Sequence, residues 1–416
     1  MKIRASRLSN IYFICSVFIL CLAESLNMRA LEGVDARINI KLIYVFTLLV
    51  WSLSIFKLAL PAYKLYKTAY PIILFSLFFF WSLIPTLFTK NLSITEIAVN
   101  ITLVITPMFV LWTTHNSAIQ SCYRKSEKAA FLLMFIILFM QYVSIFKEIT
   151  FLSIVHIGSS FFLLYMLPLI LTFNSKLIKI AATTIVTLTL FISMKRSGVL
   201  ALGVSLFFFI FIRQYVLHKF NFKSFIGSLI TVFVVGMLFV YLGNDDSNKE
   251  SVFERFENIE KDKGSGRLEV WEITTSMITD QDMIKLIVGN GYNTVLRDSR
   301  LQLSAHNDFL EVTYDYGLIG LFLYVCAFIS FGLYIVKMIL TRSEYAPSAA
   351  MLFIIYSAQS LISHIIIYYW ANLIMLSLGY IMALYKVNPG IPQIHEQNLN
   401  RNKEYNESSQ NKYNNC

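Results

Sequence analysis

The chain has 416 residues, of which 56% are hydrophobic and only 14% are charged, and it contains 35 Phe and 23 Tyr. A soluble domain usually has about 25% charged residues and roughly 45–50% apolar ones. This excess of apolar residues excludes a soluble enzyme, a disordered chain and a secreted disulfide scaffold. The five cysteines show no metal-ligand or paired spacing. The composition therefore predicts an all-α, polytopic integral membrane protein.

Apolar runs long enough to cross a bilayer recur along the chain. A membrane-spanning helix needs about 20 apolar residues, within a range of roughly 17–25. The sequence predicts about twelve spans, at 8–23, 42–56, 69–87, 94–112, 129–146, 157–173, 177–194, 197–212, 225–242, 317–336, 348–368 and 370–385. The predicted regions are nine N-terminal spans in 1–242, a long polar loop at 243–316 that contains short helices, three spans in 317–386 and a disordered tail at 387–416.

The placement of Lys and Arg predicts the orientation, because short cytoplasmic loops are enriched in these residues. With the N-terminus inside, the cytoplasmic segments hold 20 of the 35 basic residues and the short outer loops hold 7. The loop 243–316 holds the other 8, together with 15 of the 25 acidic residues, as expected of a water-exposed outer segment. Both termini are therefore predicted to be cytoplasmic. The net charge of +10 is then a topology signal rather than a nucleic-acid patch.

Ionisable residues are scarce in the middle of the predicted spans. Three acidic residues, Glu24, Glu96 and Glu148, lie near the outer boundary instead. A proton- or ion-coupled transporter is expected to bury carboxylates, or to break helices, near the membrane midplane. The distribution therefore argues against transport and favours chemistry at the outer surface on a lipid-borne substrate.

The first candidate site is a pair of cations between two spans on the predicted outer side. Lys195 and Arg196 lie in the segment 193–198, which leaves almost no loop between the spans. A helix that starts near Ser197 would direct its N-terminal amide groups and dipole towards an anion. Two cations beside such a helix start suit a phosphate group. The alternative is that both side chains extend to the membrane interface without binding a ligand.

The second candidate site is Arg267, which follows a Gly-Ser-Gly run and precedes Trp271. Gly266 or the serine before it can cap a helix from Arg267 to about Thr279. A cation in the first turn is unfavourable unless an anion lies nearby, and the alternative is a solvated pair with Glu269 or Glu272. One face of this helix, predicted to lie on the membrane or on the helix bundle, holds Leu268, Trp271, Thr275 and Ile278.

The third candidate site is His306. Asn307 or Asp308 can cap a helix that leads into the span 317–336, which places His306 at the outer mouth of the membrane. Of the six histidines, only His306 combines an outer position, a helix start and nearby carboxylates, those of Asp308 and Glu311. A neutral imidazole with a pKa near 6.5 can accept a hydroxyl proton. A surface or capping histidine is the alternative.

A catalytic metal is a weaker alternative. Two acids one residue apart are common by chance, and no second histidine stands at helical spacing from His306. His364 is predicted inside the span 348–368, away from this cluster. The ligands of such a metal would come from His306, Asp308 and Glu311, or from Asp280 and Asp282.

These segments together resemble the O-antigen ligase and O-antigen polymerase family of bacterial envelope enzymes. The resemblance covers about 190–325, whereas the earlier part of the chain is similar only in layout. It rests on three motifs in order along the chain: Arg196-Ser197-Gly198, Arg267 with Trp271, and His306-Asn307 followed by Gly317-Leu318-Ile319-Gly320.

The resemblance implies a glycosyltransferase of the bacterial inner membrane with a periplasmic active site. The donor would be an oligosaccharide on undecaprenyl diphosphate, and the glycan would move with inversion to a sugar hydroxyl. The resemblance implies His306 as the base, and Arg196 and Arg267 as the residues that hold the diphosphate, with Lys195 beside them. Asn307, Asp308 and Glu311 would orient the base or bind the acceptor, and neither a metal nor another cofactor would be needed.

The acceptor is not determined by the sequence. An O-antigen polymerase extends another lipid-linked repeat, whereas an O-antigen ligase transfers the glycan to lipid A-core in lipopolysaccharide biosynthesis. The compact loop and the richness in Asn, Lys, Ile and Phe favour the polymerase by association. A flippase for the same lipid-linked sugar is the alternative from another class. The expected partners are this lipid, the acceptor glycan, membrane lipid and a chain-length regulator, and no nucleic acid.

Overall fold

The computed structural model describes residues 2–32, 69–89, 92–120, 124–150, 158–193, 195–217, 226, 266–366 and 370–389. Every secondary-structure element in these residues is a helix, so the predicted all-α class is confirmed. The predicted span 42–56, the predicted span 225–242 except residue 226, and the predicted tail from residue 390 onwards lie outside the described residues.

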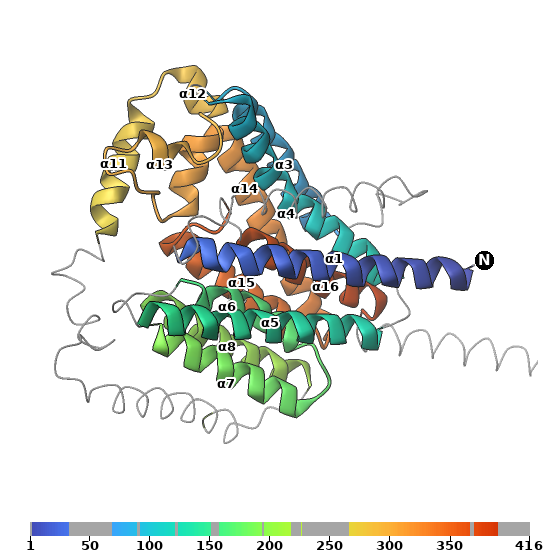
Figure 1. Ribbon diagram of the computed structural model, residues 1–416. Coiled ribbons are helices and arrows are strands. Elements are labelled where there is room, and N and C mark those ends of the chain that lie inside the picture. Colours follow the sequence, from blue (N-terminus) through green and yellow to red (C-terminus); the bar gives the residue numbers. More distant parts are fainter. Residues whose placement is uncertain are drawn as a thin grey trace, which may run out of the picture.

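The described helices match the other predicted spans in place and order (Figure 1). Seven of them are long and apolar enough to cross a membrane, and two shorter apolar helices accompany them. A polytopic membrane protein is therefore confirmed. The helices are α1 (Lys2–Leu31), α3 (Tyr70–Leu87), α4 (Ile94–Gln120), α5 (Arg124–Thr150), α6 (Ser160–Ile170), α7 (Lys176–Ile192), α8 (Arg196–Val216), α11 (Arg267–Thr279), α12 (Met283–Val288), α13 (Thr294–Asp298), α14 (Asp308–Leu340), α15 (Ala346–Ile362) and α16 (Trp370–Val387).

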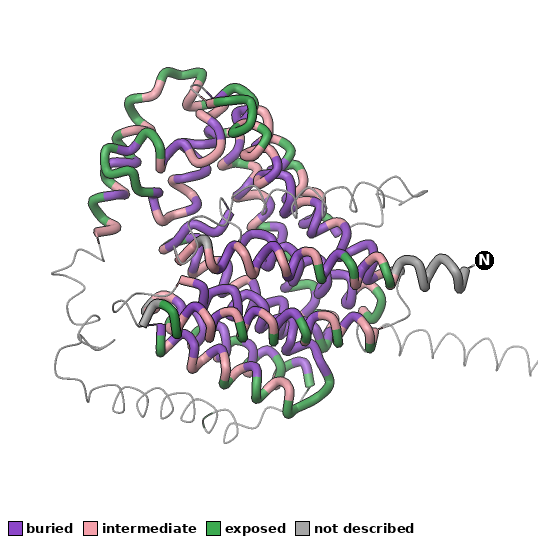
Figure 2. The backbone as a smooth tube through the Cα atoms, viewed as in Figure 1, coloured by how far each residue is buried: buried purple, intermediate pink, exposed green. Residues whose placement is uncertain are grey.

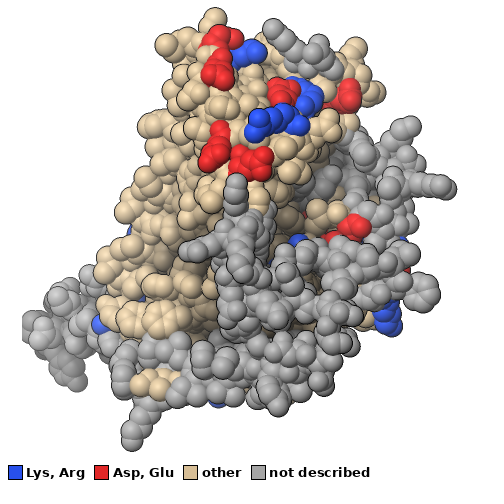
Figure 3. Space-filling model, turned by 90° about the vertical axis from the view of Figure 1, so that its left-hand side faces the viewer, with Lys and Arg blue, Asp and Glu red and all other residues tan. Residues whose placement is uncertain are grey.

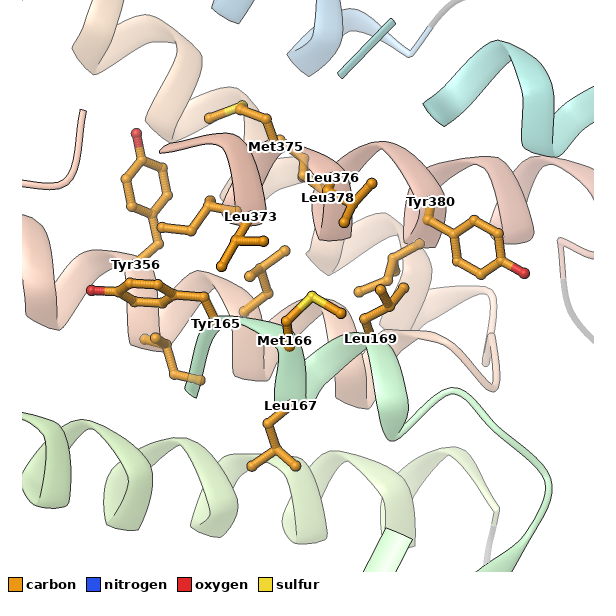
Figure 4. Packing of buried hydrophobic residues seen from close by; sticks show 14 of the residues in the cluster. Tyr165, Met166, Leu167, Leu169, Tyr356, Leu373, Met375, Leu376, Leu378 and Tyr380 are labelled. Atoms are coloured by element: carbon orange, nitrogen blue, oxygen red, sulfur yellow. The ribbon is translucent and has the colours of Figure 1, made fainter. Parts of the chain in front are cut away.

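The short helix α6 forms the centre of the bundle. All 11 of its residues are buried, and α5, α7, α15 and α16 pack around it. Tyr165 and Met166 point towards α16, whereas Leu167 points the other way (Figure 4). A helix that is apolar on all sides is stable only where other helices surround it. The buried residues in Figure 2 accordingly follow the middle of the bundle.

The helix ends gather at two opposite ends of the bundle, as the alternating spans require. At one end Glu32, just after α1, accepts a 2.6 Å hydrogen bond from the Ser159 amide before α6, and the last turn of α15 contacts the start of α8. At the other end, α14 and α16 finish together, where the hydroxyl groups of Thr341 and Tyr385 are 3.1 Å apart. The end that carries α11, α12 and α13 is called the lobe end below (Figure 1).

The lobe consists of residues 266–307 and includes α11, α12 and α13. Charged side chains gather on this part of the molecule, above a flank that is mostly uncharged (Figure 3). The predicted helix from Arg267 to Thr279 is confirmed as α11, with Gly266 as its N-cap. The lobe thus lies within the predicted polar loop 243–316, of which residues 243–265 are outside the described part.

The packed face of α11 differs from the amphipathic face predicted from the sequence. Val270, Ile273 and Thr274 are buried, and a small cluster of Val295, Ala305 and Tyr314 lies nearby. Leu268, on the predicted face, is 51% exposed, and Thr275 is also exposed. Trp271 and Ile278, on the same predicted face, are partly buried, so the predicted face is only partly packed. Contact of this helix with the membrane stays a prediction. The lobe and the start of α14 share this small core, which a periodicity argument about one helix could not reveal.

A buried carboxylate on α14 holds the lobe in place. Asp315 accepts hydrogen bonds from the amides of Asn293 at 2.7 Å, Thr294 at 3.0 Å and Val295 at 3.2 Å. The Thr294 hydroxyl donates a further bond of 2.6 Å. Removing such an acceptor would leave buried donors without partners, at a cost of about 1–3 kcal/mol for each donor. This contact was not foreseen from the sequence, because its two sides are about twenty residues apart.

Helix α14 is kinked at Gly317, which has a φ of 70° and a ψ of −176°. The kink frees backbone carbonyl groups, and other parts of the fold bond to them. The Asn290 amide donates to Tyr314 at 3.2 Å and the Gly291 amide to Asp315 at 2.7 Å. Because buried carbonyl groups need partners, the kink and the docking of the lobe stabilise each other.

Gly317→Ala is expected to destabilise the protein by about 2 kcal/mol or more. The left-handed φ is strained for any residue with a side chain, and an added Cβ would collide with the Ile287 carbonyl oxygen. The measurement is thermal unfolding of the purified protein in detergent. Gly332→Ala on the same helix is the matched control, because its Cβ would lie 3.4 Å from Phe353, an ordinary contact. Equal midpoints for the two variants would contradict the prediction.

Candidate active site

His306 lies at the end of the lobe, two residues before α14, with a left-handed φ of 52°. Histidine adopts this conformation less readily than glycine, and such backbone strain often occurs at functional sites. The next residue, Asn307, is the N-cap of α14. Its Oδ1 accepts bonds from the amides of Phe309 at 2.9 Å and Leu310 at 3.2 Å. The predicted capping by Asn307 or Asp308 is thus confirmed for Asn307, and the cap fixes the direction of the chain at His306.

The two carboxylates beside His306 bond to backbone amides. Glu311 is buried and accepts a 2.6 Å bond from the amide of Ala305, the residue before His306. Asp308 is buried too, and its Oδ1 accepts bonds from the amides of Ile365 at 2.7 Å and Ile366 at 3.2 Å. Both predicted orienting residues therefore act on the backbone around the site rather than on the ring of His306.

Arg267 and Lys195 both act electrostatically on His306. Arg267 is the first residue of α11, and Lys195 immediately precedes α8. Burial, as the largest cause, and the positive charges of Arg267 and Lys195 together lower the pKa of His306 to about 4. Charges have this effect only at short range in a protein. The structure thus brings together a neutral imidazole and two cations from three separate segments of the chain.

The short link between α7 and α8 is as tight as the sequence predicts. Helix α8 begins at Arg196, whose side chain lies outside the described part of the structure. Gln359 on α15 donates a 3.2 Å bond to the Ser197 carbonyl and so ties the link to α15. Lys195 also acts electrostatically on a carboxylate of the protein itself, that of Glu32. Burial raises the pKa of Glu32, while the Ser159 amide and the Lys195 charge oppose that rise.

His364 contradicts the position predicted from the sequence. Helix α15 ends at Ile362, so His364 lies in the connection to α16 and not inside a span. Its ring centroid is 4.6 Å from that of His306. The predicted span 348–368 was too long because the polar pair Ser363-His364 was read as part of an apolar run. These two polar residues in an apolar run indicate, in the sequence, that the helix ends near the site.

A cleft of about 360 Å³ lies elsewhere in the lobe, between α11 and the segment after α13. It contains none of the predicted site residues, so it is distinct from the candidate site. Of the two acids considered as metal ligands in this region, Asp282 caps α12 by accepting a 2.9 Å bond from the Lys285 amide. The cleft is lined by Glu272, Ile273, Ser276, Met277, Asp298 and Arg300.

The comparisons with known proteins concern the segment that carries the candidate site. A family described as O-antigen ligase matches residues 180–325. The match covers about a third of the chain. It confirms the resemblance stated from the sequence for this segment and supports a function of the ligase and polymerase type. No curated protein matches the chain.

The O-antigen ligase segment contains all the site residues predicted from the sequence. It runs from α7 through α8 and the lobe into α14. His364 and α16 lie beyond it. The neighbourhood of His306 is thus built from the family segment together with C-terminal residues that sequence reasoning did not connect to it.

Proposed function

We propose that this protein is an O-antigen polymerase, which transfers a glycan from undecaprenyl diphosphate to a sugar hydroxyl of another lipid-linked repeat. The observation that carries the proposal is the convergence of His306, Arg267 and Lys195 at the lobe end, within the segment that matches the family. A proton acceptor beside two cations suits a reaction in which a hydroxyl group attacks and a diphosphate leaves.

The proposed reaction is a single inverting displacement. The acceptor oxygen forms a bond to the anomeric carbon of the donor, and the bond from that carbon to the diphosphate oxygen breaks. The diphosphate leaves with the bonding electrons, while His306 takes the hydroxyl proton. Arg267, Lys195 and Arg196 would stabilise the charge that grows on the leaving group. Asn307, Asp308 and Glu311 would hold the loop that presents His306.

Transfer to lipid A-core is the second candidate, because the matching family is described as O-antigen ligase. The two activities would share the donor and the chemistry and would differ in the acceptor. A flippase is the candidate from another class. In both enzymatic cases we propose an inner-membrane protein with both termini in the cytoplasm and the site in the periplasm, which would meet lipid-linked glycan, membrane lipid and a chain-length regulator.

Deletion of the gene tests the proposal and separates the three functions. Lipopolysaccharide from the deletion strain is resolved on a gel, and lipid-linked glycan is extracted from its membranes. Core with a single repeat supports the polymerase. Core without repeats, together with accumulated lipid-linked polymer, identifies a ligase. Single units retained on the cytoplasmic side identify a flippase and would contradict both enzymatic functions.

The pH dependence of transfer is expected to follow the lowered pKa of His306. A general base works only when it is unprotonated, and His306 with a pKa of about 4 stays neutral well below pH 6.5. We therefore expect kcat/KM to remain constant from pH 7 to about pH 5 and to fall by half near pH 4. The measurement uses donor and acceptor extracted from the deletion strain. A half-maximal rate near pH 6.5 would show that the base is an unperturbed group.

A further inference from the structure

His364 takes no part in the reaction proposed above, yet its ring lies against the ring of the proposed base. The ring centroids of His306 and His364 are 4.6 Å apart, with an angle of 36° between the ring planes. His364 is 7% exposed, so the imidazole is almost completely removed from solvent. A buried polar ring in contact with a candidate catalytic group calls for a physical explanation.

The ring of His364 is fixed by the groups around it. On one face it stacks on Trp370, the first residue of α16, with a centroid distance of 5.8 Å and an interplanar angle of 12°. Its Nδ1 lies 3.1 Å from the hydroxyl oxygen of Ser304, two residues before His306. Trp370 and Ser304 are themselves buried. The His364 ring is therefore a preorganised surface against which His306 rests.

The backbone that carries His364 is tied to the same helix start that presents His306. The Asp308 carboxylate accepts hydrogen bonds from the amides of Ile365 and Ile366, directly after His364. The side-chain amide of Asn307 donates a 3.1 Å bond to the Leu361 carbonyl, near the end of α15. The first two residues of this helix start therefore fix His364 relative to His306.

His306 needs such support because its own chain gives it little. It stands in a left-handed backbone conformation at the end of the lobe, and within the described part of the chain its ring makes no hydrogen bond. A mobile base catalyses the reaction more slowly, because misplacement of a reacting group by about 1 Å can lower the rate about 10²-fold. Packing against a fixed ring is the remaining way to hold the imidazole.

We propose that His364 is a positioning residue for His306: its fixed ring holds the base in the orientation that accepts the proton of the acceptor hydroxyl. This inference rests on the proposed transferase function. Arg267 on α11 acts electrostatically on both rings, and Lys195 before α8 acts on His306. The carboxylate of Asp308 bonds to the backbone just after His364. Beside two cations, a neutral second ring can support His306 without adding charge.

The test measures kcat and KM of full-length variants with lipid-linked donor extracted from membranes of the deletion strain. His364→Ala removes the ring and is expected to lower kcat about 10- to 100-fold, with KM for the donor changed by less than about twofold. His364→Phe keeps a flat ring of similar size and is expected to restore kcat to within about fivefold of the native enzyme. A purely structural role would not produce this rescue together with an unchanged KM.

Two results would overturn the inference: native kcat in His364→Ala, or a loss in His364→Phe as large as in His364→Ala. If the alanine variant is not recovered from membranes, Ser304→Ala replaces it, because it removes only the contact to Nδ1. Ser304→Ala is expected to lower kcat about threefold to tenfold, and native kcat would again overturn the inference.

Two further variants separate this inference from the proposed function. His115→Phe changes another buried histidine, which packs against Gly379 of α16 rather than against the site, and it should leave kcat unchanged. His306→Ala in the same assay tests the function itself. Full activity of His306→Ala would refute the proposed chemistry, whereas an inactive His306→Ala with native-like His364 variants would refute only the positioning role.

Discussion

His306→Ala is expected to lower the rate of glycan transfer by about 10²–10⁴-fold, the usual contribution of a general base. The imidazole is neutral near pH 7, because burial and the nearby cations lower its pKa to about 4. His306→Gln should be as inactive as His306→Ala, because an amide can form a hydrogen bond but cannot accept the proton. The assay follows release of lipid diphosphate by the purified protein from extracted lipid-linked donor.

The control for His306 is the folded state of the variants. Asn307 and Glu311 hold the backbone on both sides of His306, and neither contact involves the imidazole. Thermal unfolding of both variants in detergent should therefore stay close to that of the native protein. Substantial transfer by a stably folded His306→Gln would show that another group takes the proton.

Arg267→Ala is expected to lower transfer by about 10²–10³-fold, as when a preorganised charge is removed from a leaving group. Arg267→Lys should recover part of the rate, because it keeps the charge but not the two-pronged geometry that suits a diphosphate. Removing the guanidinium should also raise the pKa of His306, since Arg267 now lowers it. The acid limb of the pH profile should then move to higher pH.

Arg297→Ala is the matched control for Arg267. Arg297 lies in the same lobe and is exposed, and its ion pair of 3.0 Å is with the neighbouring Asp298. Exposed pairs contribute about 1 kcal/mol or less, so this variant should keep nearly native transfer. A similar loss in both variants would mean that the net charge of the lobe matters and that Arg267 has no specific role.

The features predicted correctly from the sequence are those set by local chemistry. The bounds of α11 follow from a glycine at its start, and the start of α14 follows from the cap at Asn307. Apolar length likewise fixed the spans, because a bilayer demands it. In each case the decisive residues are within a few positions of the element that they define.

The features missed depend on contacts between distant parts of the chain. Asp308 and Glu311 were expected to orient the ring of His306 or to bind the acceptor. Both accept hydrogen bonds from backbone amides, and Asp308 accepts a further one from the Tyr324 hydroxyl, none of which the sequence indicated. His364 was assigned to a span, although it packs on His306 from 58 positions away. No periodicity or spacing rule brings two such residues together, because the approach of α15 to α14 is a property of the packed bundle.

The length of α14 determines where the candidate site lies relative to the hydrocarbon layer of the membrane. The part of α14 from Gly317 to Leu340 corresponds to about 36 Å at a rise of about 1.5 Å per residue, which is enough to cross a hydrocarbon layer about 30 Å thick. The part before the kink would therefore lie outside the acyl chains, at the level of lipid phosphates. With the donor proposed above, the polyprenyl carrier would deliver its sugar without lifting its tail out of the leaflet.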